Sequence, residues 1–309
     1  MKVIYSITRG FFYLLSLLPY RIIYVLSDAL YPLIYYVARY RRKVVRSNLT
    51  SSFPEKTPEE IKEIERNFYH HLCDYFLETI KLLSTTPEKI LRHVEFHGEE
   101  EMAKCFDRGQ SCSILLGHYN NWEYLPALKL KFDKHPDVVQ GMIYHPLRNK
   151  VFDRLFIEMR QQLGGVCIAK NNILRKLVEL RREKRIYYFG YISDQGPKWE
   201  NIHLWLPFLN HDTPVFTNGE KIMRKMNEAV FYLEMRKMGR GKYTIYLTPI
   251  TYTPNELEEN AITRRFFEML EDTIRREPSF YLWTHNRWKR THEEFDRRFK
   301  TVNGKVLPR

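Results

Sequence analysis

The chain contains the segment Ser113-Ile-Leu-Leu-Gly-His-Tyr-Asn-Asn-Trp-Glu123, which leads from an apolar run through a glycine into polar residues. The apolar residues 111–116 predict a short buried strand, and Gly117 allows a sharp turn after it. His118 is then expected at the carboxyl end of that strand, where open α/β sheets tend to place their binding sites. The segment therefore predicts an α/β fold with a site that begins at His118.

The histidine and the carboxylate of this segment have a spacing that suits proton transfer. Asn120 is a candidate N-cap, which would place Glu123 in the first turn of the following helix. A histidine that removes a proton from a hydroxyl needs a partner that fixes its tautomer, so His118 and Glu123 are the candidate catalytic pair. The alternative is structural: Glu123 then complements the helix dipole, and His118 is a hydrogen-bonded turn residue.

The composition describes one large domain, with or without an appendage, in a chain of 309 residues. The 50 Lys and Arg against 37 Asp and Glu give a net charge of +13. Such an excess favours anionic partners: nucleic acid, an acidic lipid surface or an acidic carrier protein. The four cysteines lack the spacing of a metal site and are expected to be reduced, mostly buried thiols, so we assign no metal.

The N-terminal part is the most apolar of the chain and raises the question of a membrane segment. Residues 11–38 form three apolar pieces, separated at Pro19 and at Asp28. None of them reaches the roughly 18 residues that indicate a clear spanning helix. Two membrane arrangements stay open, a single tilted span and a pair of helices that lie on the bilayer surface. A buried helical hairpin is the alternative without a membrane.

A basic cluster follows directly after these apolar pieces. It consists of Arg39, Arg41, Arg42, Lys43 and Arg46. Lysine and arginine beside an apolar segment mark the cytoplasmic side of a membrane and attract anionic lipid. We therefore predict that residues 1–46 are a membrane-anchoring helical segment with a basic flank, and that residues 47–309 form the α/β domain.

Downstream of the basic cluster, strand-like and helix-like patterns alternate. The predicted strands are 111–116, 138–144, 186–192, 229–236 and 243–250. The predicted helices are 57–83, 122–132, 149–163, 171–184, 217–227 and 260–276. Strands that alternate with helices predict a central, mostly parallel sheet flanked by helices. The turn-like residues 237–242 join the last two strands and predict an antiparallel hairpin at one edge.

Polar residues at other predicted strand ends extend the candidate site. Arg148 and Asn149 follow the second strand, where an arginine can bind a phosphate or stabilise an oxyanion; the alternative is a surface arginine beside an Asn helix cap. Asp194 ends the third strand and is a candidate to orient a site residue, or else a turn former. With Asn121, which lies inside the opening segment, these residues are the predicted substrate-binding or oxyanion group.

Five segments, in order along nearly the whole chain, resemble the late acyltransferases of lipid A biosynthesis, the lauroyl and myristoyl transferase family. They are Gly117-His118-Tyr-Asn-Asn-Trp-Glu123, Tyr144-His145-Pro146-Leu147-Arg148-Asn149, Asp194-Gln195, Pro207-Phe208-Leu209 and Tyr281-Leu-Trp283-Thr-His285-Asn-Arg287. The second segment often has arginine where this chain has His145, so the cation role is expected to fall on Arg148. The fourth is followed by Asn210-His-Asp-Thr-Pro214 instead of a glycine-rich sequence, which bears on the identity of the acceptor.

The resemblance implies a fold like that of the glycerolipid acyltransferases, with membrane-associated N-terminal helices. It implies an O-acyltransferase that moves a fatty acyl chain from an acyl carrier protein thioester to a hydroxyl of a lipid A precursor, at the cytoplasmic face of the bacterial inner membrane. His118 is the expected general base, oriented by Glu123. Acyl carrier protein, the anionic glycolipid acceptor and the membrane are the expected partners. No cofactor is expected besides the co-substrate, an acyl carrier protein thioester or acyl-CoA.

Three other functions stay open at this point. Acceptor choice depends on pocket shape, so the acceptor could be an amino-acid lipid or a lysophospholipid. The net charge and the aromatic and cationic residues 278–290 also fit a nucleic-acid-binding protein, but no recognised binding module is present and we expect no nucleic acid partner. A metal-dependent hydrolase would use His118 and Glu123, but the chain has no convincing third ligand at a typical spacing.

Overall fold

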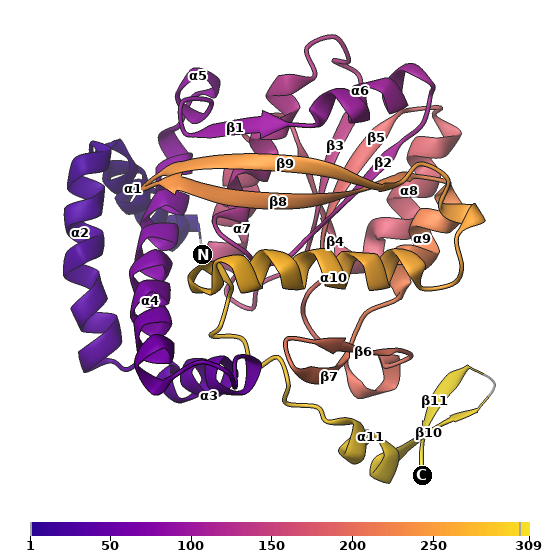
Figure 1. Cartoon of the computed structure of the whole chain (residues 1–309). Coiled ribbons are helices and arrows are strands. Elements are labelled where there is room, and N and C mark those ends of the chain that lie inside the picture. The colour runs from indigo at the N-terminus through magenta and orange to yellow at the C-terminus, as the bar shows by residue number, and fades with distance from the viewer. Residues whose placement is uncertain (1, 303) are drawn as a thin grey trace.

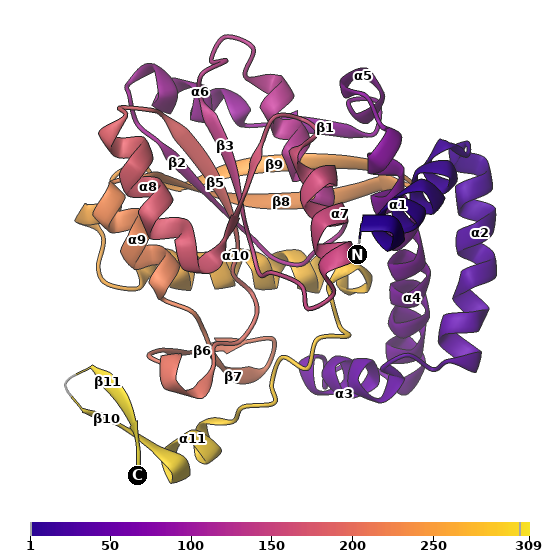
Figure 2. The same ribbon diagram turned by 180° about the vertical axis from the view of Figure 1, so that it is seen from behind.

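A seven-stranded sheet forms the centre of the computed structural model, which describes residues 2–302 and 304–309 (Figure 1). Its strand order is β1-β9-β8-β2-β5-β3-β4. The strands are β1 (Val94–His97), β2 (Cys112–Leu116), β3 (Val139–Tyr144), β4 (Val166–Ala169), β5 (Tyr187–Ile192), β8 (Ala229–Gly239) and β9 (Lys242–Thr251). Helices cover both faces of the sheet, as the views from the two sides show (Figure 1, Figure 2).

Five neighbouring strands of this sheet, β8, β2, β5, β3 and β4, run parallel to one another. β9 pairs antiparallel with β8, and β1 lies parallel to β9 at the edge. The predicted mostly parallel sheet with an antiparallel hairpin is therefore confirmed. β1 and β4 have four residues each and lie outside the predicted strands, because runs this short carry little periodicity.

Most helices form where the apolar periodicity predicts them. They include α4 (Pro58–Lys81), α7 (Lys150–Gln161), α8 (Ile173–Arg182), α9 (Asn218–Met226) and α10 (Ala261–Arg276). The exception is the predicted helix 122–132, which is the 3₁₀ helix η3 (Trp122–Lys131). Pro126 has no backbone N–H to continue an α-helix, and the residues from Glu123 to Leu128 are all buried. Tertiary packing therefore decides the backbone conformation of this segment.

Two apolar layers pack against the two faces of the sheet. On one face α8, α9 and α10 contribute Leu177, Met223 and Phe266. On the other face α6 (Glu99–Asp107), η3 and α7 contribute Met102, Leu128 and Met159. Because both faces are covered, β2 and β5 are buried along nearly their whole length. Polar side chains can then meet a substrate at the strand ends, which is typical of parallel sheets.

Four helices at the N-terminus lie together beside the sheet (Figure 1). They are α1 (Lys2–Leu17), α2 (Tyr20–Pro32), α3 (Arg42–Ser52) and α4, with the π-helical turn η1 (Leu33–Val37) after α2. Within the described residues no helix is by itself long and apolar enough to cross a membrane; α1 and α2 with η1 reach that length and hydropathy only together, and they are bent by 113°. Their large exposed side chains include Ile7, Phe11, Leu14 and Val25.

A buried carboxylate lies near the amino ends of β2, β5 and β8. Glu228 is 0% exposed, and its carboxylate accepts hydrogen bonds from the hydroxyl of Ser113 and, at 2.6 Å, from that of Tyr187. Burial raises the pKa of Glu228 to about 7, although the two hydrogen bonds lower it. The folded protein therefore holds this proton more tightly than the unfolded chain does. The contribution of the Glu228 carboxyl group to stability is present below its pKa in the unfolded chain and is lost as the pH rises through 7.

We expect the substitution Glu228→Gln, which imitates the protonated carboxyl group, to stabilise the protein at pH 8 by up to about 3 kcal/mol. The difference should shrink as the pH falls toward 5, because the wild-type carboxyl is then protonated in the folded state. Thermal unfolding of both proteins in detergent at pH 5 and pH 8 measures this. An equal difference at the two pH values would mean that the charge of Glu228 is not its cause.

Candidate active site

His118 lies in the turn after β2, at the predicted carboxyl end of the strand, and a distant segment holds this turn. Leu282 N donates a hydrogen bond to His118 O at 3.1 Å, and Asn120 N donates to Phe280 O at 2.9 Å. The prediction that Asn120 is the N-cap is wrong. Its φ of 55° places it in the left-handed region, and Asn121 is the N-cap of the helix that begins at Trp122. The backbone that follows His118 is therefore held by residues 280–282.

The side chain of His118 contacts Asp194, which follows β5. The parallel register of β2 and β5 pairs Leu116 with Ile192, so the residues two positions further along each strand end are neighbours. His118 Nδ1 lies 2.7 Å from Asp194 Oδ1. Burial raises the pKa of Asp194, but the positive charge of the imidazole and its hydrogen bond outweigh burial and leave the pKa below its ordinary value. Asp194 thus has the geometry of a residue that orients the imidazole.

The predicted contact between Glu123 and His118 is wrong. Among the described residues, the Glu123 carboxylate forms its hydrogen bonds with the guanidinium group of Arg160 on α7, whose Nε lies 2.7 Å from Glu123 Oε2. Glu123 does lie in the first turn of η3, but this turn faces α7. Burial lowers the pKa of Arg160, but the charge and the hydrogen bond of Glu123 more than compensate, so that this pKa is raised and the guanidinium group stays charged.

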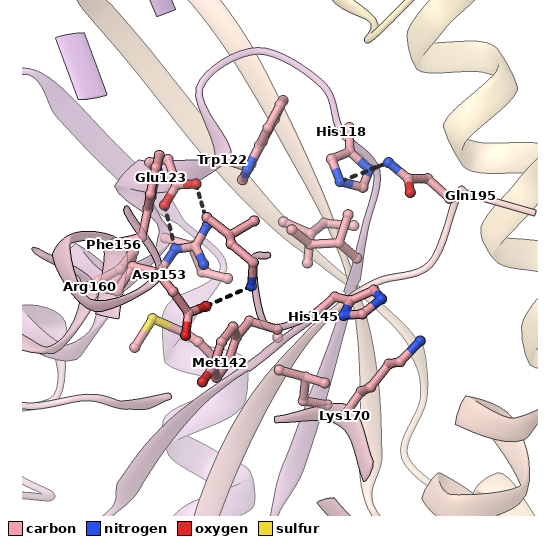
Figure 3. A pocket seen from close by; sticks show the side chains of 18 of the residues that line it. His118, Trp122, Glu123, Met142, His145, Asp153, Phe156, Arg160, Lys170 and Gln195 are labelled. Atoms are coloured by element: carbon pink, nitrogen blue, oxygen red, sulfur yellow. Dashed lines mark hydrogen bonds and ion pairs between the residues drawn. The ribbon is translucent and has the colours of Figure 1, made fainter. Parts of the chain in front are cut away.

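A cavity of about 440 Å³ opens beside His118 (Figure 3). Side chains from the ends of β2, β3, β4 and β5 and from η3 and α7 line it. Its charged and polar lining residues other than tyrosine and tryptophan are His118, Glu123, His145, Asp153, Arg160, Lys170 and Gln195. Trp122 packs edge-on against the imidazole, with the ring centres 4.9 Å apart. The cavity therefore combines ionic groups with an aromatic and apolar wall.

Gln195 reaches the imidazole from the loop after β5 (Figure 3). Its amide nitrogen lies 3.3 Å from His118 Nε2 and 3.5 Å from His118 Nδ1. The ionised Asp194 carboxylate can only accept hydrogen bonds, so Nδ1 of the neutral imidazole carries the proton and Nε2 has the free lone pair. The two similar distances place the Gln195 amide over the face of the imidazole ring and outside its plane, so the lone pair of Nε2 is free to accept a proton.

None of the four predicted substrate-binding residues lines this cavity. Asp194 is buried against His118, and the other three lie elsewhere. Asn149 caps α7, accepting a hydrogen bond from Val151 N at 3.0 Å. Arg148, directly before the cap, is exposed and lies outside the cavity lining. Asn121 is buried, and its amide donates to Glu78 Oε2 at 3.0 Å. For Arg148 and Asn149 the structure therefore shows the alternative, a surface arginine beside an Asn helix cap.

Five of these charged and polar lining residues lie outside the predicted site: His145, Asp153, Arg160, Lys170 and Gln195. Asp153 lies in the first turn of α7 and accepts a hydrogen bond of 2.7 Å from Leu147 N. His145 and Gln195 stand at strand ends, each in a segment that also carries a predicted residue, so the strand end is the signal that identifies them. Lys170 follows β4, a strand too short to predict. Arg160 lies in the last turn of α7 and has no local signal at all, because its role depends on contact with Glu123.

The segment after η7 (Pro278–Phe280) lies close to the pair of His118 and Asp194 and affects its electrostatics. Arg287 is 3% exposed, and its charge helps to lower the pKa of Asp194. Burial lowers the pKa of His285 to about 4, so its imidazole is neutral at physiological pH. Asn48 of α3 donates hydrogen bonds of 2.9 Å to the carbonyl oxygens of Trp283 and His285. The N-terminal helices are thereby tied to the site.

This fold and site define an α/β enzyme that can remove a proton from a hydroxyl group, because a buried carboxylate orients an imidazole beside a cavity. Residues 1–290 match the family model of the bacterial lipid A biosynthesis acyltransferases. The chain therefore belongs to this family, and it is an O-acyltransferase.

Curated relatives are similar to this chain over most of its length at low identity. The lipid A biosynthesis palmitoleoyltransferase of Escherichia coli (strain K12) is 21% identical over 284 residues, which cover 91% of this chain and 89% of that protein. The lauroyltransferase of the same strain is 23% identical over 294 residues, covering 94% and 92%. The myristoyltransferase is 23% identical over 240 residues, covering 76% and 71%. Because these relatives are named for different acyl groups, similarity to them does not fix the acyl chain length here.

Proposed function

We propose that this enzyme transfers a fatty acyl chain from a thioester donor to a hydroxyl group of a lipid A precursor. Membership of the lipid A acyltransferase family supports the acceptor class. The observation that carries the chemistry is the distance of 2.7 Å between His118 Nδ1 and Asp194 Oδ1 beside a cavity. This contact leaves Nε2 of the imidazole as the nitrogen that accepts a proton.

In the proposed reaction the acceptor hydroxyl gives its proton to His118 Nε2 while its oxygen attacks the thioester carbonyl carbon. The C–O bond forms and the carbonyl electron pair moves onto the carbonyl oxygen. The tetrahedral intermediate then expels the thiolate, which takes the proton from the imidazolium. Asp194 stabilises the imidazolium in between. The described lining of the cavity contains no serine, threonine or cysteine, which supports direct transfer without an acyl-enzyme.

We propose acyl carrier protein as the donor, with acyl-CoA as the alternative. The net charge of +13 supports an acidic carrier and a phosphorylated acceptor, because both are attracted to a basic surface. Lys170 lies at the cavity with an exposed side chain. It is therefore a better candidate than Arg148 for the cation that meets a substrate phosphate.

A second, apolar cavity adjoins the first and offers a place for the acyl chain. Side chains of α1, α4 and α7 line it, and nearly all of them are aliphatic or aromatic. Tyr75 and Phe156 belong to the linings of both cavities. Phe12 of α1 and Phe152 of α7 meet edge to face in its wall, with ring centres 5.9 Å apart. An acyl chain whose thioester lies at His118 can therefore extend toward α1.

We expect Phe152→Ala, which removes an aromatic ring from this wall, to shift the preferred donor toward longer acyl chains. Each additional buried methylene group contributes about 0.8 kcal/mol, so two of them change the ratio of kcat/KM values by roughly tenfold. Competition between donors that differ by two carbons, followed by mass spectrometry of the products, measures the shift.

The matched control for this substitution is Phe216→Ala. Phe216 is 38% exposed, against 36% for Phe152, and lies outside the linings of both cavities. It should leave the chain-length preference unchanged. If Phe152→Ala also leaves the preference unchanged, the acyl chain does not occupy the second cavity.

We also propose that the enzyme works at the cytoplasmic face of the bacterial inner membrane, with α1 and α2 in contact with the bilayer. The large apolar side chains exposed on these helices support this. Tyr36, which precedes the basic cluster, and Tyr40, which lies inside it, are about half exposed, which suits the headgroup level. The bend of 113° between α1 and α2 favours helices that lie on the surface over one straight span.

Acyl transfer by the purified enzyme in detergent tests the proposal. Labelled acyl carrier protein thioesters or acyl-CoA are offered with a tetra- or penta-acylated lipid A precursor, and the product is identified by its mass. We expect one added acyl group and faster transfer from acyl carrier protein. Transfer only to an amino-acid lipid or a lysophospholipid, offered in parallel reactions, would replace the acceptor, whereas absence of thioester consumption would contradict the proposed chemistry.

A further inference from the structure

The five cations of the basic cluster line a single open groove at the start of α3. The volume of this groove is about 480 Å³, and its lining consists of Arg39, Arg41, Arg42, Lys43, Val44 and Arg46. We call these six residues the basic groove. None of them belongs to the lining of the cavity beside His118, so the basic groove is separate from the proposed reaction site.

One buried carboxylate neutralises part of the charge of the basic groove. Glu65 of α4 is 0% exposed and accepts hydrogen bonds from Arg42 Nε at 3.2 Å and from Arg46 Nε at 2.7 Å. Among the described residues, the structure shows no ion pair for the other three cations, and the sequence has no Asp or Glu between residues 29 and 54. Five cations beside one carboxylate leave an excess of four positive charges, which attracts an anion.

Contacts with two other parts of the protein hold the turn that carries the basic groove. Tyr69 of α4 donates a hydrogen bond of 2.5 Å to Tyr40 O. Arg41 Nη1 donates one of 2.9 Å to Thr284 O, in the segment that follows η7. Asn48 of α3 donates to the same segment. Because the protein itself holds the backbone of the groove, a ligand binds there at a low cost in conformational entropy.

Exposed apolar and aromatic side chains come directly before the basic groove in the chain. Leu33 is 53% exposed and Val37 is 73% exposed, and Tyr36 is exposed beside them. They continue the exposed apolar surface of α1 and α2, and α3 lies at one end of these helices (Figure 1). Cations at the edge of an apolar surface lie at the depth of the phosphate groups of a bilayer. This position favours a lipid phosphate over a dissolved anion.

We propose that the basic groove is a binding site for the phosphate of an anionic phospholipid headgroup. Arg39 and Lys43 supply charge that no carboxylate in the described structure neutralises. The amino end of α3 adds to this attraction, because Arg41 at the N-cap forms no side-chain capping hydrogen bond and a helix dipole favours an anion there. The bound lipid holds the N-terminal helices at the membrane surface. This inference rests on the proposed location at the membrane and adds a lipid site to it.

Retention of labelled phosphatidylglycerol by the immobilised full-length protein in detergent micelles tests this site. The double variant Arg39→Gln with Lys43→Gln removes two cations and keeps the three arginines that contact other parts of the fold. Each Lys or Arg near an anionic surface contributes a factor of roughly five in affinity, so we expect the dissociation constant to rise about 30-fold. Equal affinity of the wild type for phosphatidylcholine, which has no net charge, would contradict the inference.

The matched control is the double variant Lys221→Gln with Lys225→Gln. These lysines are also exposed and four positions apart, on α9, which lies far from α3 (Figure 1, Figure 2). We expect the control to weaken binding less than about threefold, since charges beyond a Debye length of about 8 Å are largely screened. Both double variants lower the net charge by the same amount. If they weaken binding equally, net charge and not a site attracts the lipid, and the inference is wrong.

Competition with inorganic phosphate distinguishes a lipid phosphate from a dissolved one. We expect inorganic phosphate to displace the labelled lipid only at far higher concentrations than unlabelled phosphatidylglycerol does, because it has no apolar chains to place against the exposed side chains of α1 and α2. Displacement at similar concentrations would make a dissolved phosphate the ligand and would overturn the lipid assignment.

Turnover distinguishes this site from one for the phosphate of the acceptor. In detergent without phosphatidylglycerol, acyl transfer by Arg39→Gln with Lys43→Gln should equal that of the wild type. On vesicles that contain phosphatidylglycerol, transfer by this variant should be slower, because less of it is bound to the membrane. A raised KM of the acceptor in detergent would assign the groove to the acceptor and overturn the inference. If the wild type transfers no acyl group, the proposed function fails, while the binding measurements still decide the lipid site.

Discussion

Replacement of His118 by alanine is expected to abolish acyl transfer and to leave the fold intact. The substitution removes the proposed general base, which typically contributes 10²- to 10⁴-fold to a rate, and it also removes the group that returns the proton to the leaving thiolate. We expect turnover to fall at least about 10³-fold on these grounds. The imidazole lies at a cavity wall, 18% exposed, so its loss leaves little unfilled space in the core. Transfer assays with parallel thermal unfolding measure both effects.

The chain offers a closely matched control in His135. Its side chain is 19% exposed, and its Nε2 lies 3.6 Å from an oxygen of Asp107, so it too is a partly buried histidine beside a carboxylate. It lies outside the lining of the cavity, and His135→Ala is expected to keep wild-type turnover. Near-normal turnover of a correctly folded His118→Ala variant would refute the proposed mechanism.

The second large effect is expected from Asp194→Asn, with a loss in kcat of about 10³- to 10⁴-fold. An ionised aspartate accepts the hydrogen bond from Nδ1 and leaves the lone pair on Nε2. The amide of asparagine donates as well, which favours the tautomer with the lone pair on Nδ1, where it faces away from the acceptor. The substituted side chain has nearly the same shape, so the backbone of the β5 loop should be retained.

A comparison with Glu123→Gln decides between the pair predicted from the sequence and the pair in the structure. Glu123 is 3% exposed and pairs with the partly buried guanidinium group of Arg160. We expect Glu123→Gln to destabilise the protein, since loss of one charge of a buried pair is costly, but to reduce turnover per folded molecule far less than Asp194→Asn does. Thermal unfolding and kcat of the two variants separate stability from catalysis. The reverse order of the kcat losses would return Glu123 to the role of partner of the imidazole.

Asp74→Asn serves as the control for the loss of a buried carboxylate as such. The Asp74 side chain is 5% exposed and pairs with Arg240 at 2.7 Å, away from the cavity. We expect Asp74→Asn to lower the unfolding temperature without the loss in kcat that is expected for Asp194→Asn. A loss in kcat equal to that of Asp194→Asn would mean that the fold, and not the tautomer of the imidazole, responds to both substitutions.

Local sequence determined much of this protein. Apolar periodicity is a property of a dozen neighbouring residues, and it predicted the longer strands, the helices α4, α7, α8, α9 and α10, and the hairpin of β8 and β9. It also placed His118 and Asp194 at strand ends, because a buried apolar strand ends where glycine or polar residues begin. The strands β1 and β4 were not predicted, because they have too few residues to show a period. The helix type of η3 was not predicted either, because it depends on Pro126 and on the buried surroundings.

The partners of the candidate catalytic side chains were decided by tertiary structure alone. His118 and Glu123 are five residues apart, but the backbone of η3 turns the carboxylate toward Arg160, 37 residues further along the chain. His118 and Asp194 are separated by 76 residues, and they meet because β2 and β5 pair in parallel with Leu116 opposite Ile192. Strand register depends on the packing of the whole sheet. Sequence therefore determined which residues stand at the carboxyl ends of the strands, and the order and register of the strands decided which of them touch.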